Sequence, residues 1–187
     1  CRVHRSGADG SLVASVVPRA ASADCDGEAL EFWAKGYDGL YADGEGVAPA
    51  ASALAVARAD DASLDFAGWQ STFTGGAISR AQMVEWRQTT VDRVLALKPK
   101  RVIELGFGTG LLTWGLVPHL ESYNGTDLSA AAVERARAAA AAAGVTHAHF
   151  GVGAAHEVAA LSAEARAACD LVLINSVVHY FPNANYL

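Results

Sequence analysis

Short apolar runs alternate with helical segments in the second half of the chain. Runs at 101–105, 122–127, 146–152 and 170–174 predict four strands, and the stretches 111–120, 129–143 and 157–168 between them predict helices. Strands that alternate with helices predict an α/β domain, with a parallel sheet covered by helices on both faces. The last strand is apolar almost throughout, which is typical of a buried parallel strand.

The first half predicts different elements. Residues 1–20 form two short runs around a glycine-containing turn, which predicts a β-hairpin. Helical patterns follow at 27–41 and 79–97, and the apolar residues of the second pattern are Met83, Trp86, Val91, Val94 and Leu95. We therefore divide the chain into a hairpin (1–20), a linker with a helical lid (21–98) and a core (99–187).

Composition narrows the class of protein. The 187 residues are 52% hydrophobic, enough for one main domain, and the net charge of −6 comes without a Lys/Arg cluster, so no nucleic-acid partner is expected. No apolar run reaches bilayer length, and the 3 cysteines lack metal-ligand spacing. These features predict a cytoplasmic protein with reduced thiols, no membrane segment and no metal. Because the chain starts at Cys1 and stops after the fourth strand, we expect a piece of a larger protein.

Three alternating glycines follow the strand 101–105. Gly106, Gly108 and Gly110 allow a sharp turn and a close approach of backbone to a ligand. A dinucleotide fingerprint places its third glycine one residue later, where this chain has Leu111, so NAD is disfavoured. The alternative is that the three glycines form an ordinary strand-to-helix turn that binds no cofactor.

Two carboxylates accompany the glycines. Glu104 ends the strand before the loop, where it would repel a pyrophosphate and attract an ammonium or sulfonium group. Asp127 ends the second strand, where it could accept hydrogen bonds from ribose hydroxyls or serve as the N-cap of the next helix. S-adenosylmethionine carries both cationic groups and a ribose.

Several segments together resemble one family. They are Asp65–Gly75, Met83–Arg87, Val102–Gly110 and the distinctive block Asn175–Pro182. From about Glu28 to Leu187 the chain resembles the methyltransferase domains embedded in nonribosomal peptide synthetases. The resemblance implies a class I, Rossmann-like methyltransferase fold, of which about four of roughly seven strands are present, so that the fourth strand would be an exposed edge. The hairpin resembles the small C-terminal subdomain of an adenylation domain, which implies an interrupted adenylation domain.

The resemblance also implies a site. Its cofactor-binding residues would be Tyr37, Glu104, Gly106, Phe107, Gly108, Thr109, Gly110, Asp127, Leu128, Glu157, Asn175 and Ser176, and its catalytic residues would be His179, Tyr180 and Asn175. An imidazole has a reference pKa of about 6.5, so His179 could accept the proton of an amine, with Tyr180 and Asn175 as orienting groups. A polar loop residue is the alternative for His179.

The other candidate site residues each have a structural interpretation that needs no ligand. Glu157, with His156, could lie near the adenine or could begin a helix. Tyr37 and Tyr41 could touch the cofactor carboxylate or pack in the core, and Trp69 could roof the pocket or be buried. His147 and His149 have no convincing ligand spacing, so a structural or exposed position is expected.

The implied reaction is N-methylation, with S-adenosylmethionine, of an aminoacyl thioester on a phosphopantetheinylated peptidyl carrier domain. Further partners would be the rest of the adenylation domain, with its ATP and Mg, and an MbtH-like protein. A side-chain O- or S-methyltransferase would share every cofactor motif. A non-catalytic docking insert is disfavoured by the intact glycines and carboxylates, and an oxidoreductase is disfavoured by Leu111.

Overall fold

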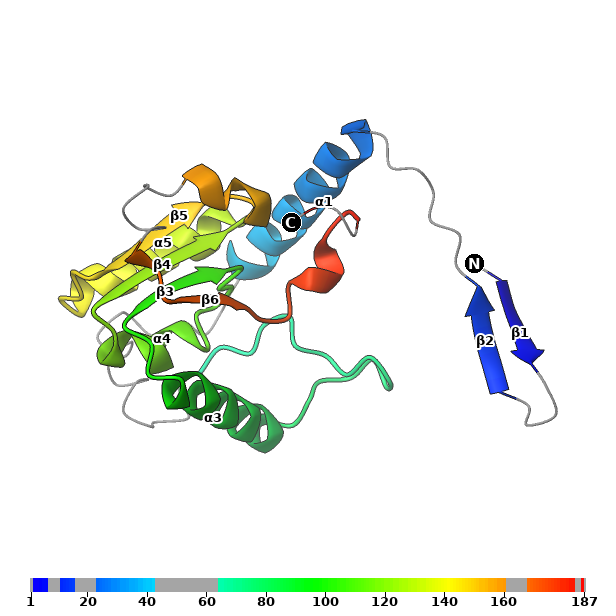
Figure 1. Cartoon of the computed structure of the whole chain (residues 1–187), viewed down its shortest axis with the longest axis horizontal. Helices are drawn as coiled ribbons and strands as arrows, with labels where there is room; N and C mark the ends of the chain where they lie inside the picture. Colours follow the sequence, from blue (N-terminus) through cyan, green and yellow to red (C-terminus); the bar gives the residue numbers. More distant parts are fainter. Residues whose placement is uncertain are drawn as a thin grey trace.

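The computed structural model describes residues 2–6, 11–15, 23–42, 64–160, 168–183 and 186. Its main sheet is parallel, with the strand order β5-β4-β3-β6. The strands are β3 (Arg101–Leu105), β4 (Ser122–Asp127), β5 (Ala148–Val152) and β6 (Leu171–Ile174). The four predicted strands and their parallel arrangement are therefore confirmed, and Figure 1 shows them side by side.

The predicted hairpin is also present. Strands β1 (Arg2–Ser6) and β2 (Ser11–Ser15) pair antiparallel, with Arg2 opposite Ser15 and Ser6 opposite Ser11. Residues 16–20 of the predicted hairpin segment lie outside the described residues.

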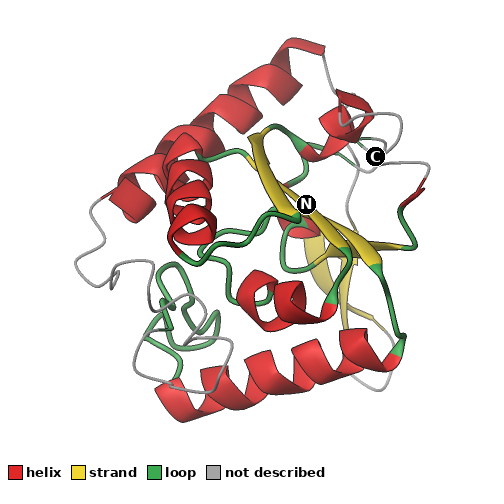
Figure 2. Ribbon diagram, turned by 90° about the vertical axis from the view of Figure 1, so that its left-hand side faces the viewer, coloured by secondary structure: helices red, strands yellow, loops and turns green. Residues whose placement is uncertain are grey.

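Helices flank the sheet, as Figure 2 shows. The α-helices are α1 (Ala23–Ala42), α3 (Arg80–Ala96), α4 (Thr113–Leu116) and α5 (Ala130–Ala142), and the 3₁₀ helices are η3 (Val117–His119), η4 (Ala155–Ala160) and η5 (Val178–Tyr180). Ser79 and Ser129 cap α3 and α5, because each side chain accepts a hydrogen bond from the backbone three residues later. Among the described helices, none has the length and apolar content needed to cross a bilayer.

The two faces of β3 belong to different cores. Val102 packs in the larger core with Tyr123 and Phe150 of the sheet and with residues of α3, α4 and α5. Ile103 and Leu105 face the other way, toward η4 and the segment after β6. Alternate side chains of a strand point to opposite faces, so β3 is covered on both sides, as predicted. The prediction that the last strand is buried is wrong: β6 is only partly buried and Val172 is 52% exposed, because β6 in the described part of the chain pairs with β3 alone.

Two predicted helices are wrong in detail. The segment 111–120 holds only the short α4 and then the 3₁₀ helix η3, because Pro118 cannot donate the backbone hydrogen bond that would continue an α-helix. The segment predicted to begin at Glu157 is a 3₁₀ helix that starts two residues earlier, and residues 161–167 are outside the described part. On α3, Arg87 is buried beside the apolar residues, and its Nε donates to the carbonyl of Leu111 at 2.6 Å.

Helix α1 is fastened to α5 by polar contacts. The Oδ1 atom of Asp38 accepts hydrogen bonds from Ser129 Oγ at 2.6 Å and from the backbone N–H of Ala131 at 3.2 Å. The guanidinium of Arg135 donates to the carbonyl of Tyr41 at 3.0 Å and forms a 2.9 Å ion pair with Asp65. The end of α1 is therefore held over the carboxyl end of β4, where α5 begins.

Replacement of Asp38 tests this attachment. Asp38→Ala removes an acceptor from two donors at the start of α5 and should lower the free energy of unfolding by about 1–3 kcal/mol. Glu31→Ala is the matched control on α1, because Glu31 forms only an exposed pair with Lys35 and should contribute less than about 0.5 kcal/mol. Urea denaturation of both variants measures the difference, and equal losses would contradict the role of Asp38.

Candidate functional site

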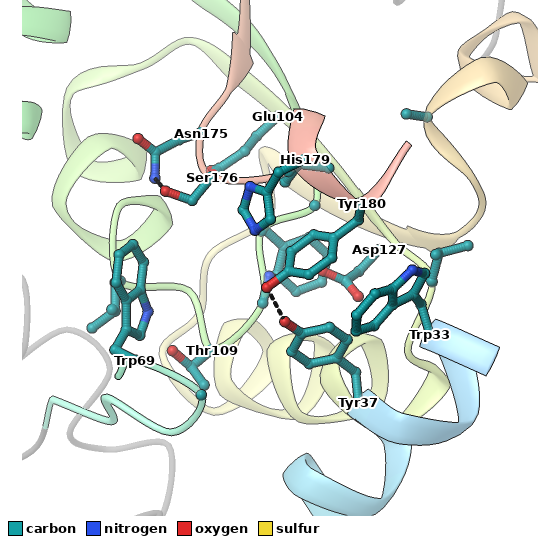
Figure 3. A pocket seen from close by; sticks show the side chains of 18 of the residues that line it. Trp33, Tyr37, Trp69, Glu104, Thr109, Asp127, Asn175, Ser176, His179 and Tyr180 are labelled. Carbon is teal, nitrogen blue, oxygen red and sulfur yellow. Dashed lines mark hydrogen bonds between the residues drawn. The ribbon is translucent and has the colours of Figure 1, made fainter. Parts of the chain in front are cut away.

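A cavity of about 520 Å³ lies at the carboxyl ends of β3, β4 and β6 (Figure 3). Helix α1 and the loop around Trp69 form its other walls. Of the predicted site residues, the cavity is lined by Tyr37, Glu104, Gly106, Phe107, Gly108, Thr109, Asp127, Leu128, Asn175, Ser176, His179 and Tyr180. The structure thus brings together residues of three strands and a helix that are far apart in sequence.

Each glycine of the loop after β3 has a positive φ and a close neighbour. A Cβ on Gly106 (φ +75°) would lie 2.4 Å from a methyl carbon of Val177, and one on Gly108 (φ +56°) would lie 3.1 Å from the hydroxyl of Tyr41. A Cβ on Gly110 (φ +82°) would lie 2.5 Å from the ring nitrogen of Trp114. Because both the conformation and the neighbouring side chains disfavour a Cβ, the packing of the protein itself requires glycine at these three positions.

Glu104 is a buried carboxylate on the cavity side of β3. Its Oε2 accepts hydrogen bonds from the hydroxyls of Tyr123 at 2.6 Å and Thr113 at 3.1 Å. Burial raises the pKa of Glu104 to about 7, although the two hydroxyl hydrogen bonds act in the opposite direction. Burial therefore opposes ionisation of Glu104, and a cation in the cavity would favour it.

Asp127 supports the glycine loop from the end of β4. Its Oδ2 accepts a hydrogen bond from the N–H of Gly108 at 2.8 Å, and its Oδ1 accepts one from the N–H of Ser129 at 2.9 Å. Burial raises the pKa of Asp127, and these backbone hydrogen bonds lower it. The N-cap of α5 is Ser129, so the capping alternative for Asp127 is wrong, and its carboxylate faces the cavity.

Helix α1 contributes an aromatic wall. Trp33, Tyr37 and Tyr41 are four residues apart, so they lie on one face of the helix. The Tyr37 hydroxyl donates a hydrogen bond to the Tyr180 hydroxyl, drawn dashed in Figure 3, and the Trp33 ring centroid lies 4.7 Å from that of Tyr180. Burial, followed by the contact with Tyr180, raises the pKa of Tyr37. The wall therefore joins α1 to η5, the segment that carries His179.

The opposite wall is built from tryptophans. The ring centroids of Trp69 and Trp86 are 4.5 Å apart, and both side chains line the cavity. Asp65 holds this wall, because its side chain accepts the N–H of Ala67 at 2.9 Å and its carbonyl accepts the hydroxyl of Thr109 at 2.8 Å. Trp69 therefore lies over the cavity, and it also packs in a small core.

Some candidates lie elsewhere. Gly110 and Glu157 are not among the described residues that line the cavity; Glu157 Oε2 instead accepts the backbone N–H of Ala154 at 2.8 Å and closes the turn before η4. His156 contacts the hydroxyl of Tyr186 at 2.8 Å. His147 contacts the carbonyl of Val117 at 3.0 Å, which fits the structural position expected of it.

Five residues that line the cavity or support it were not predicted as site residues from the sequence: Trp33, Trp86, Thr113, Tyr123 and Tyr186. The spacing of Trp33 from the two tyrosines of α1 could have identified it, because residues four apart share a helix face. Trp86 was assigned to a core face, and it does pack there while also reaching the cavity. Thr113 and Tyr123 carry no local signal, since the pairing of β3 with β4 brings Tyr123 to Glu104 and the position of α4 brings Thr113 to it.

The charge of the cavity has one sign. Among the described lining residues, the carboxylates are Glu104 and Asp127, His179 is the one imidazole, and there is no Lys or Arg. No cluster of three or more metal-ligating side chains occurs in the described part of the chain. A cavity with these properties favours a ligand that carries a positive charge.

The fold and this site define a class I methyltransferase domain, a class that uses S-adenosylmethionine. Residues 102–187 match the family described as "Methyltransferase domain". The chain belongs, more narrowly, to the methyltransferase domains found in nonribosomal peptide synthetases, because regions of several such synthetases are among its relatives.

Three relatives illustrate the similarity. A probable nonribosomal peptide synthetase, CymA of Salinispora arenicola, is 41% identical over 186 residues, which is 100% of this chain and 2% of CymA. Chondramide synthase of Chondromyces crocatus is 36% identical over 68% of this chain and 3% of its own length. Enniatin synthase of Fusarium equiseti is 34% identical over 86% of this chain and 5% of its own length. The chain therefore spans a very small part of each relative.

The raised pKa of Glu104 predicts a pH-dependent loss of stability. The unfolded carboxyl has a pKa near 4.5 and the folded one about 7, so the folded state holds the proton more tightly. The contribution of Glu104 to the free energy of unfolding is then largest below pH 4.5. It falls as pH rises toward 7 and stays low above pH 7, and the total loss is about 3 kcal/mol.

Glu104→Gln isolates this contribution. The stability of the variant relative to the wild type should shift in favour of the variant by about 3 kcal/mol between pH 4 and pH 8. Denaturation at a series of pH values measures the shift, with Glu85→Gln at an exposed position of α3 as the control. A difference that does not change with pH would show that Glu104 keeps an ordinary pKa.

Proposed function

We propose that the chain transfers a methyl group from S-adenosylmethionine to the amino nitrogen of an aminoacyl thioester, held on the phosphopantetheine arm of a peptidyl carrier domain. The observation that carries this proposal is the composition of one cavity. A glycine loop and two buried carboxylates form one side, and an exposed imidazole stands on the other. The synthetases related to this chain supply the assembly-line context.

The residues present fit the methyl donor. Glu104 would receive its ammonium group, and the backbone of the loop 106–109 would lie along its methionine portion. Asp127 would receive the ribose hydroxyls, because each of its oxygens accepts one backbone hydrogen bond and retains capacity for another. When bound, S-adenosylmethionine supplies a methyl group on a sulfonium, ready for displacement by a nucleophile.

A thioester suits this cavity better than a free amino acid. The methyl donor already brings one carboxylate to a cavity that is lined by Glu104 and Asp127, and the described lining offers no Lys or Arg. The carboxylate of a free amino acid would add a second negative charge without a cationic partner. A thioester removes that negative charge. The acidic lining also attracts an amine, which points to nitrogen as the acceptor atom.

Proton removal falls to His179. An α-amine has a reference pKa near 8, so at neutral pH most of it is protonated and unable to attack. His179 lines the cavity from η5 and is exposed, so that it can pass an accepted proton to water. Its ring centroid lies 3.9 Å from that of Tyr180, which fixes its position, while Tyr180 and Asn175 orient the acceptor.

The surrounding organisation follows from the hairpin. Strands β1 and β2 form a two-stranded ribbon ahead of the linker and lid (21–98) and the core (99–187). We assign this ribbon to the C-terminal subdomain of an adenylation domain that the methyltransferase interrupts. The adenylation portion would use ATP and Mg, and an MbtH-like protein would be a further partner.

Transfer of a labelled methyl group tests the function. The protein should move tritium from labelled S-adenosylmethionine to an aminoacyl-loaded carrier protein, and mass spectrometry should locate the methyl on the α-nitrogen. Asp127→Asn should weaken cofactor binding by about 1–3 kcal/mol, because a charged acceptor is lost. Glu134→Gln, at an exposed position of α5 outside the described cavity lining, is the control. Methyl on a side-chain oxygen or sulfur would replace the N-methylation proposal, and absence of transfer by the wild type would reject it.

Replacement of His179 tests the base. His179→Ala should lower the rate of methyl transfer by roughly 10²–10⁴-fold, with cofactor affinity nearly unchanged. Added imidazole should restore part of the rate. His149→Ala, at an exposed position of β5, is the control. If the loss appears only as a raised apparent KM for the loaded carrier, His179 orients the substrate and does not take its proton.

A further inference from the structure

Gly125 leaves a gap beside Glu104 in the sheet. The two residues are partners in the parallel register of β3 and β4, and Tyr123 is two residues earlier on the same face of β4. A Cβ on Gly125 would lie 3.0 Å from both Cε1 and the hydroxyl oxygen of Tyr123. The Tyr123 ring therefore lies across Gly125 and reaches Glu104 because position 125 has no side chain.

One carboxylate oxygen of Glu104 accepts both of its side-chain hydrogen bonds. Tyr123 and Thr113 both donate to Oε2, and their hydroxyl oxygens are 2.9 Å from each other. The exposed fractions are 0% for both donors and 3% for Glu104. Within the described part of the chain, no hydrogen bond falls on Oε1, although Glu104 lines the cavity.

We propose that Tyr123 and Thr113 are positioning residues that hold Oε2 of Glu104, so that Oε1 faces the cavity and receives the ammonium group of the methyl donor. The proposal rests on the assignment of Glu104 to that ammonium group. A carboxylate fixed through one oxygen presents the other in a defined direction, which an ammonium with three donors can meet. Neither hydroxyl touches the cofactor.

Hydroxyls take the place of a cation in this arrangement. The described lining holds no Lys or Arg, and its titratable groups besides Glu104 are Asp127 of β4, Tyr37 and Tyr41 of α1, His179 and Tyr180 of η5, and Tyr186 after η5. Asp127 opposes ionisation of Glu104, and the two hydroxyl hydrogen bonds favour it by lowering its pKa. Removal of a hydroxyl should therefore weaken cofactor binding most at low pH, where Glu104 would be protonated more often.

Two nucleosides separate this role from a structural one. S-adenosylhomocysteine carries an α-ammonium and an α-carboxylate group, whereas 5′-methylthioadenosine shares the adenosine and the thioether and lacks both groups, so the Glu104→Gln background described below is needed to assign a loss to the ammonium. Tyr123→Phe should weaken binding of S-adenosylhomocysteine roughly 10- to 100-fold at pH 7 and leave binding of 5′-methylthioadenosine within about twofold. The loss should be larger at pH 6 than at pH 8. Titration calorimetry on the purified protein measures all of these affinities.

Matched variants complete the test. Thr113→Val should act in the same direction as Tyr123→Phe, with a smaller effect because its hydrogen bond is longer. Thr126→Val is the control, since it removes a buried hydroxyl of the same strand that has no hydrogen-bond partner among the described residues. In a Glu104→Gln background, Tyr123→Phe should have no further effect on S-adenosylhomocysteine.

The outcomes are distinguishable. Equal weakening of both nucleosides by Tyr123→Phe, or a loss that persists in the Glu104→Gln background, would overturn the positioning role. Unchanged affinity for S-adenosylhomocysteine in both Tyr123→Phe and Thr113→Val would overturn it as well. Failure of the wild-type protein to bind either nucleoside would instead reject the proposed function itself.

Discussion

The site depends on the exclusion of side chains from the loop after β3. Val177 of the segment after β6, Tyr41 of α1 and Trp114 of α4 each occupy the space that a Cβ on one of the three glycines would need. The loop is therefore the point at which three separate elements approach one another. Tyr41 and Val177 also line the cavity beside this loop, so the same close packing shapes two of its walls.

The two buried carboxylates are the second constraint on the site. Two carboxylates are buried at the ends of neighbouring strands, and hydroxyl and amide donors support them in place of cations. Such an arrangement costs stability when the cavity contains no cation and recovers it when one binds. Two buried carboxylates are unfavourable for folding alone, and the binding of a cationic ligand would explain their presence.

The four strands and their parallel arrangement were predicted well from the sequence, because each strand is a local apolar run. The carboxyl ends of parallel strands lie at one edge of the sheet, so the location of the site could be predicted too. Glu104, Asp127 and the Asn175 block were found for the same reason. Pro118 carries a local signal that the pattern of apolar residues outweighed, which is why the helix over 111–120 was overpredicted. Arg87, Thr113 and Tyr123 could not be placed, since their partners are distant in sequence and come together only through packing and strand register.

The strand order divides the cavity unequally. The glycine loop and both carboxylates belong to β3 and β4, which have a partner on each side, whereas Asn175, His179 and Tyr180 follow β6, which in the described part of the chain pairs with β3 alone. In the proposed function the methyl donor would lie against the interior strands of the sheet, and the acceptor would lie against the residues that follow its margin strand. Substitutions after β6 could then change the acceptor while Glu104, Asp127 and the glycine loop stay in place.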